Sequence, residues 1–103
     1  MYRYAVNNSA PRPESYLTDY LTANDPSLAT PLTESERADL YAELASGAES
    51  GWDYSSRWEK NFNAAGTDNQ LPGLRTLNVR GTIPVDLNSI LCTRLFCFHL
   101  YWV

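Results

Sequence analysis

One ten-residue segment of the chain combines the side chains that bind and cleave sugars. Residues 49–58 read ESGWDYSSRW and place two carboxylates, Glu49 and Asp53, among two tryptophans, a tyrosine and an arginine. Aromatic faces can bind the apolar face of a sugar ring, while carboxylates and arginine can bind its hydroxyls. A carboxyl group beside indole rings is desolvated, which raises its pKa and keeps it protonated enough to act as a general acid.

The alternative for this segment is structural, a helix end followed by a turn. Under that interpretation Trp52 and Trp58 are ordinary core residues, and the local composition alone favours it over a catalytic site. The choice therefore depends on what the rest of the chain contributes.

Two helices are predicted before this segment. Proline suits the first turn of a helix because its missing N–H costs nothing there, so Pro13 predicts a helix over about residues 13–22. The second helix opens with a capping box, in which Thr33 caps the helix and Glu36 reaches back to it. Each helix carries one apolar stripe, formed by Tyr16, Leu17, Tyr20 and Leu21 in the first and by Leu40, Tyr41, Leu44, Ala45 and Ala48 in the second.

After the segment the pattern is less regular. Residues 59–73 are polar and rich in turn formers, which predicts a surface loop, and residues 74–79 predict a short extended piece. A third helix is expected after Pro84, with an apolar stripe of Leu87, Ile90 and Leu91. One-sided helices must pack against something larger, and 103 residues offer little chain for a core of their own.

Charge and composition exclude several classes of function. The net charge is −4 and the eight Lys and Arg residues are scattered, so no cationic surface for nucleic acid is expected. Cys92 and Cys97 with His99 do not make a tetrahedral zinc set. The N-terminus lacks the apolar core of a signal peptide, and the apolar run of residues 95–103 is far below the roughly 20 residues that span a bilayer. No membrane contact is therefore evident.

Three motifs in the chain resemble segments of the trehalase family, glycoside hydrolase family 37. They are PRPESY at residues 11–16, ESGWDYSSRW at residues 49–58 and IPVDLN at residues 83–88, in the family's order and with about its spacing. The resemblance extends to about residue 92. It implies a mainly α fold, a fragment of an (α/α)6 barrel, with residues 1–92 forming part of a catalytic domain. Residues 93–103 are expected to be a non-homologous apolar tail.

The resemblance also implies an activity, the hydrolysis of α,α-trehalose to two glucose molecules with inversion at the anomeric carbon and without a metal or other cofactor. Asp53 matches the family's general acid. The positions that match substrate contacts are Arg12, Pro13, Glu14 and Gly51.

The family's general base is a glutamate well beyond the IPVDLN motif, and the chain ends before it. Asp86 and Asn88 of that motif are expected to have a mainly structural role. The chain is therefore expected to be a trehalase fragment that is inactive alone. The alternative is a small non-catalytic helical protein derived from a trehalase.

Overall fold

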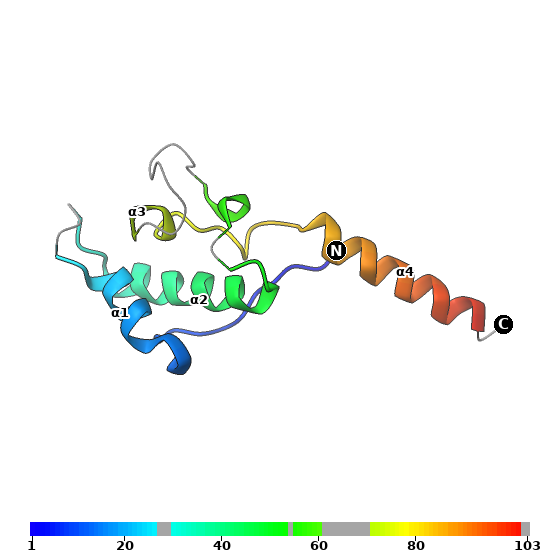
Figure 1. The fold of residues 1–103 in the computed structure, drawn as a ribbon, viewed down its shortest axis with the longest axis horizontal. Helices are drawn as coiled ribbons and strands as arrows, with labels where there is room; N and C mark the ends of the chain where they lie inside the picture. The colour runs from blue at the N-terminus through cyan, green and yellow to red at the C-terminus, as the bar shows by residue number, and fades with distance from the viewer. Residues whose placement is uncertain (27–29, 54, 61–70, 102–103) are drawn as a thin grey trace.

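The computed structural model describes residues 1–26, 30–53, 55–60 and 71–101 (Figure 1). These ranges are mainly helical and hold no strand, only an isolated β-bridge between Glu59 and Leu77. The mainly α prediction is confirmed at this level. The helices are η1 (Pro13–Ser15), α1 (Tyr16–Asn24), α2 (Glu34–Ser50), η2 (Ser56–Trp58), α3 (Leu71–Leu74) and α4 (Val85–Tyr101).

The first predicted helix forms, but its apolar stripe is on the outside. Pro13 begins the 3-10 turn η1, which leads directly into α1. All four stripe residues are exposed, and the rings of Tyr16 and Tyr20 stack with their centroids 6.3 Å apart. The buried residues of α1 are Asp19, Thr22 and Ala23. The stripe therefore packs against nothing in the described part of the chain, and the ion pair of Asp19 with Arg12 turns the opposite face of the helix inward.

The second predicted helix is the centre of the molecule. The capping box is present as predicted: the Glu36 N–H donates to Thr33 Oγ1 at 3.3 Å, and the Thr33 N–H donates to Glu36 Oε2 at 2.8 Å. The Thr33 hydroxyl also donates to Glu36 Oε2 at 2.8 Å, and the bonds that this carboxylate accepts from the Thr33 backbone and hydroxyl lower the pKa of Glu36. The predicted stripe of α2 is buried except at Ala48, which is half-buried.

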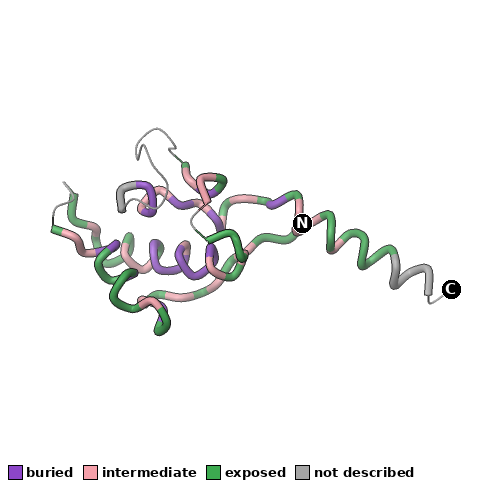
Figure 2. Tube along the Cα trace, viewed as in Figure 1, coloured by how far each residue is buried: buried purple, intermediate pink, exposed green. Residues whose placement is uncertain are grey.

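The core collects around this buried face of α2 (Figure 2). The segment from Leu74 to Val79 runs alongside α2 (Figure 1), with Leu77 and Val79 buried. Residues 71–74 form the helix α3, although residues 71–73 were predicted as loop and Leu74 as extended. Of the predicted extended piece, only Leu77 forms a β-bridge, with Glu59. The rest of the predicted loop, residues 61–70, lies outside the described residues. The core consists of Ala23, Leu40, Tyr41, Leu44, Trp58, Leu74, Leu77 and Val79.

Arg75 fastens the end of α1 to this segment. Its guanidinium donates to the carbonyl oxygens of Thr22 at 2.8 Å, Ala23 at 3.1 Å and Thr30 at 3.0 Å. The last carbonyls of a helix lack partners in the helix itself, so a cation there satisfies them and suits the helix dipole.

The third predicted helix, α4, begins after Pro84 and leads away from the body (Figure 1). Its side chains at Ile90, Leu95 and Phe96 are 60% or more exposed. The chain measures 60 × 28 × 21 Å with a radius of gyration of 16.2 Å, against about 13 Å for a compact domain of 100 residues. The helix runs without a break across residue 93, where the apolar tail was predicted to start. No helix among the described residues is long and apolar enough to cross a membrane.

Candidate functional site

The Gly51–Asp53 turn is placed by the end of α2. Gly51 adopts the left-handed conformation (φ 71°, ψ 2°), and its N–H donates to the carbonyl of Ala48 at 3.1 Å. The Trp52 N–H then donates to Ser50 Oγ at 3.0 Å, and the Ser55 N–H donates to the Trp52 carbonyl at 3.4 Å. The direction of the chain at Asp53 therefore depends on a backbone conformation that glycine adopts at little cost.

Replacing Gly51 by alanine is expected to destabilise the chain by about 1 kcal/mol, because a Cβ disfavours the left-handed conformation. No atom lies within 4 Å of the position that this Cβ would take, so the penalty comes from the backbone alone. Gly47→Ala is the matched control. Its Cβ would meet Val79 at an ordinary 3.8 Å inside a helix, where alanine is favoured. Urea unfolding followed by circular dichroism should show opposite signs for the two variants.

Asp53 is exposed in this turn. Within the described part of the chain its carboxyl group makes no hydrogen bond or ion pair. The neighbouring Trp52 is 54% exposed, and Tyr54 lies outside the described residues. The sequence suggested that Asp53 is desolvated beside indole rings, whereas the residue is exposed in the described structure. The carboxyl group is instead accessible to a molecule approaching from solvent.

The two tryptophans have different environments. Trp58 is 1% exposed and packs edge to face against Tyr4, with the ring centroids 6.4 Å apart. The structural interpretation was therefore right for Trp58 and wrong for the exposed Trp52. The Trp58 indole N–H donates to the Trp52 carbonyl at 2.8 Å, so the buried ring holds the backbone just before Asp53.

Arg57 connects the exposed turn to the beginning of α4, a contact that no sequence motif predicted. Its guanidinium carbon lies 5.0 Å from the centroid of the Trp52 ring and 4.8 Å from that of Trp58. The same guanidinium donates to both carboxylate oxygens of Asp86, at 3.2 and 3.4 Å. These bonds, followed by one from the Leu87 backbone, lower the pKa of Asp86.

Asn88 ties the N-terminal segment to the same helix. Its amide oxygen accepts from the Tyr2 N–H and its amide nitrogen donates to the Tyr2 carbonyl, both at 2.9 Å. The structural role expected of Asp86 and Asn88 agrees with these contacts.

Arg12, at the other predicted site, is buried. Its Nε and Nη2 donate to the two carboxylate oxygens of Asp19, both at 2.8 Å, and its backbone N–H donates to Asp19 at 3.0 Å. The side chains of Arg12 and Asp19 are 8% and 1% exposed. Pro13 and Glu14 follow on the surface, in η1. Three donors of Arg12, one from its backbone and two from its side chain, thus hold Asp19 in the first turn of α1, and its predicted contact with substrate stays a prediction.

The described structure does not bring the predicted site residues of η1 together with those of the Gly51–Asp53 turn. Figure 1 shows η1 beneath the middle of α2, whereas the Gly51–Asp53 turn follows the end of α2 nearer α4. The N-terminal segment joins them, through the Val6 N–H that donates to Ser46 Oγ of α2 at 2.9 Å.

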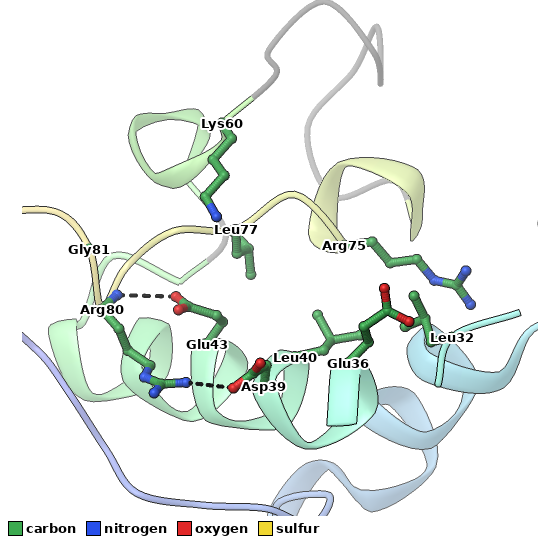
Figure 3. Close-up of a pocket in the computed structure, with 10 residues that line it drawn as sticks. All are labelled: Leu32, Glu36, Asp39, Leu40, Glu43, Lys60, Arg75, Leu77, Arg80 and Gly81. Atoms are coloured by element: carbon green, nitrogen blue, oxygen red, sulfur yellow. Dashed lines mark hydrogen bonds and ion pairs between the residues drawn. The ribbon is translucent and has the colours of Figure 1, made fainter. Parts of the chain in front are cut away.

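A groove of about 490 Å³ lies over residues 36–43 of α2 (Figure 3). None of the predicted site residues lines it. Arg80 closes one end, donating from its backbone to Glu43 at 3.1 Å and from its side chain to Asp39 at 3.5 Å. No group of three or more potential metal ligands occurs among the described residues. The lining residues are Leu32, Glu36, Asp39, Leu40, Glu43, Lys60, Arg75, Leu77, Arg80 and Gly81.

Comparison with known proteins identifies the source of the motifs. The family model described as "Trehalase" matches residues 1–96. The chain is 47% identical over 90 residues to the trehalase of Homo sapiens, covering 87% of this chain and 13% of that protein. It is 47% identical to the trehalase of Tenebrio molitor, over 87% of this chain and 15% of that protein. It is 40% identical to the periplasmic trehalase of Xanthomonas axonopodis pv. citri, over 86% of this chain and 13% of that protein.

The chain thus spans about an eighth to a seventh of the length of these relatives. No solved structure matches it. The match covers all three motifs, two of which are joined in this chain by the contact between Arg57 and Asp86. This chain belongs to the trehalase family.

Proposed function

We propose that residues 1–92 form part of the catalytic domain of an α,α-trehalase, built as an (α/α)6 barrel, and that Asp53 is its general acid. The observation that carries the proposal is the family match across all three motifs, with Asp53 on an exposed and fixed turn. The reaction is the inverting hydrolysis of trehalose to two glucose molecules.

The arrangement of the turn suits a general acid. The carboxyl group of Asp53 has no partner among the described residues, so it is free to reach the glycosidic oxygen of a bound sugar. The departing glucose oxygen takes the proton, while a base on the opposite face activates water. In an inverting glycosidase the two carboxyl groups lie about 6.5–9.5 Å apart, which leaves room for that water.

The base is not assigned to this chain. Glu49 lies in the last turn of α2, two residues before Gly51, and it does not match the family's base. Arg12, Pro13, Glu14 and Gly51 are proposed to contact the substrate. Because η1 lies apart from the Gly51–Asp53 turn, this proposal requires that the sugar or further parts of the barrel bridge the two.

The proposal is tested with a hybrid enzyme, in which residues 1–96 replace the matching segment of the human trehalase. The hybrid should release glucose from trehalose, and the 103-residue chain alone should release none, because it lacks the base and most positioning groups. The general base and the positioning groups each contribute a large factor to the rate, and acid–base assistance alone contributes about 10²–10⁴-fold. A hybrid that is folded but inactive would favour the alternative, a non-catalytic protein derived from a trehalase. Glucose release by the pure chain that is abolished by Asp53→Asn would contradict its inactivity.

A further inference from the structure

We propose that Arg57 is a positioning residue for the proposed general acid: clamped between Trp52 and Trp58 and anchored on Asp86, it fixes the Trp52–Asp53 backbone relative to α4. The inference rests on the proposed function of Asp53. It assigns no contact between Arg57 and substrate.

The rigid side of this clamp is Trp58. Its ring is almost completely buried, Tyr4 packs against it, and its carbonyl accepts from the Asn78 N–H at 2.7 Å. The indole N–H holds the Trp52 carbonyl at 2.8 Å. That carbonyl belongs to the peptide group that continues into Asp53, so a buried anchor already fixes one side of the acid's backbone.

Arg57 fixes the other side through the Trp52 ring. A guanidinium group is planar, so stacking on a ring and donating two parallel bonds to a carboxylate both constrain the same plane. In Arg57 both kinds of contact are made by one group, because its guanidinium carbon lies 5.0 and 4.8 Å from the centroids of the two indole rings and its two Nη atoms donate to Asp86. The exposed Trp52 is thereby held although it is not buried.

The anchor lies far along the chain. Asp86 stands 29 residues after Arg57, in the first turn of α4. An isolated ion pair at this exposure, 34% and 41% for the two side chains, stabilises a fold little. The contact therefore acts less on the stability of the fold than on the orientation of the turn, which carries the acid.

The clamp itself is tested in the full 103-residue chain by NMR, independently of any activity. Arg57→Gln should raise the pKa of Asp86 toward its ordinary value of 3.8, since the largest cause of its lowering is removed. Arg57→Lys should keep part of that lowering through its charge. In both variants the Trp58 indole N–H should exchange with solvent about tenfold faster or more, because its partner carbonyl is no longer held in place. Unchanged exchange and an unchanged Asp86 titration in Arg57→Gln would overturn the proposal.

The effect on the acid is tested in the hybrid enzyme. Trehalose needs the proton of the acid for departure of glucose, whereas α-glucosyl fluoride needs it much less. Arg57→Lys should lower kcat for trehalose by about 10–100-fold, as expected for a misplaced catalytic group, with a much smaller loss on the fluoride. A purely structural loss would lower both equally, through the amount of folded enzyme. The matched control is Arg80→Lys, which changes an exposed ion pair with Asp39 away from the turn and should leave both rates unchanged.

Asp53→Asn in the same hybrid separates this inference from the proposed function. If Asp53→Asn changes the ratio of the two rates and Arg57→Lys does not, the positioning role is wrong and the acid stands. If Asp53→Asn leaves the ratio unchanged, the acid assignment fails first. A change of the ratio in both variants supports both assignments.

Discussion

Asp53→Asn in the hybrid enzyme is expected to lower kcat for trehalose by about 10²–10⁴-fold, the usual contribution of a general acid. Asparagine keeps the shape and hydrogen-bonding groups of the side chain but has no proton to give. Because Asp53 is exposed and its side chain makes no hydrogen bond or ion pair within the described residues, the substitution should leave the fold intact. The loss on α-glucosyl fluoride should be much smaller, because fluoride leaves without that proton.

Asp39→Asn is the matched control for this substitution. It makes the same chemical change on α2, where Asp39 has a 74% exposed side chain and pairs with Arg80 at 3.5 Å. Steady-state kinetics on both substrates should show an unchanged enzyme. Equal losses on trehalose and on the fluoride for Asp53→Asn would assign Asp53 a positioning role instead of an acid role.

Asp19→Ala is expected to destabilise the chain by about 3–5 kcal/mol, the cost of leaving one member of a buried ion pair behind. The variant removes three hydrogen bonds to Arg12 and leaves that guanidinium in a site where its side chain is 8% exposed. Urea unfolding measured by circular dichroism gives the free energy. Asp39→Ala, which breaks the exposed pair with Arg80, should cost at most about 1 kcal/mol. Similar losses in the two variants would mean that burial does not strengthen the Arg12 pair.

This result also decides how a substitution of Arg12 can be interpreted. Arg12→Ala in the hybrid should weaken turnover of both trehalose and the fluoride, since its proposed role is to hold hydroxyls. The same substitution leaves Asp19 buried without its bidentate partner. Only the part of the loss that exceeds the loss in Asp19→Ala can be assigned to the substrate.

Local signals predicted most of the helical structure. Three helix starts were marked by backbone chemistry that is complete within a few residues. These signals are Pro13 at η1, the capping box of Thr33 and Glu36 at α2, and Pro84 before α4. The exposed stripe of α1 could not be predicted in the same way. Periodicity shows that a helix has an apolar face, but the neighbours decide which face is inward. Here the decision is made by Arg12, which binds Asp19 and buries the polar face.

The candidate site shows the same limit. The motifs pointed to Asp53 and to Arg12, and composition alone could not separate the exposed Trp52 from the buried Trp58. The contact between Arg57 and Asp86 joins residues 29 positions apart, so no pattern within either motif contains it. A signal was nevertheless present, since an arginine directly before one tryptophan and five residues after another can stack on both rings.

The pairing of Tyr2 with Asn88 has a consequence for synthesis of the protein. Its two hydrogen bonds join residues 86 positions apart, so during synthesis the Tyr2 backbone waits for the beginning of α4 before this partner exists. At about 5–20 residues per second this interval is about 4–17 s. During that time the N–H and carbonyl of Tyr2 depend on water for the hydrogen bonds that Asn88 later supplies.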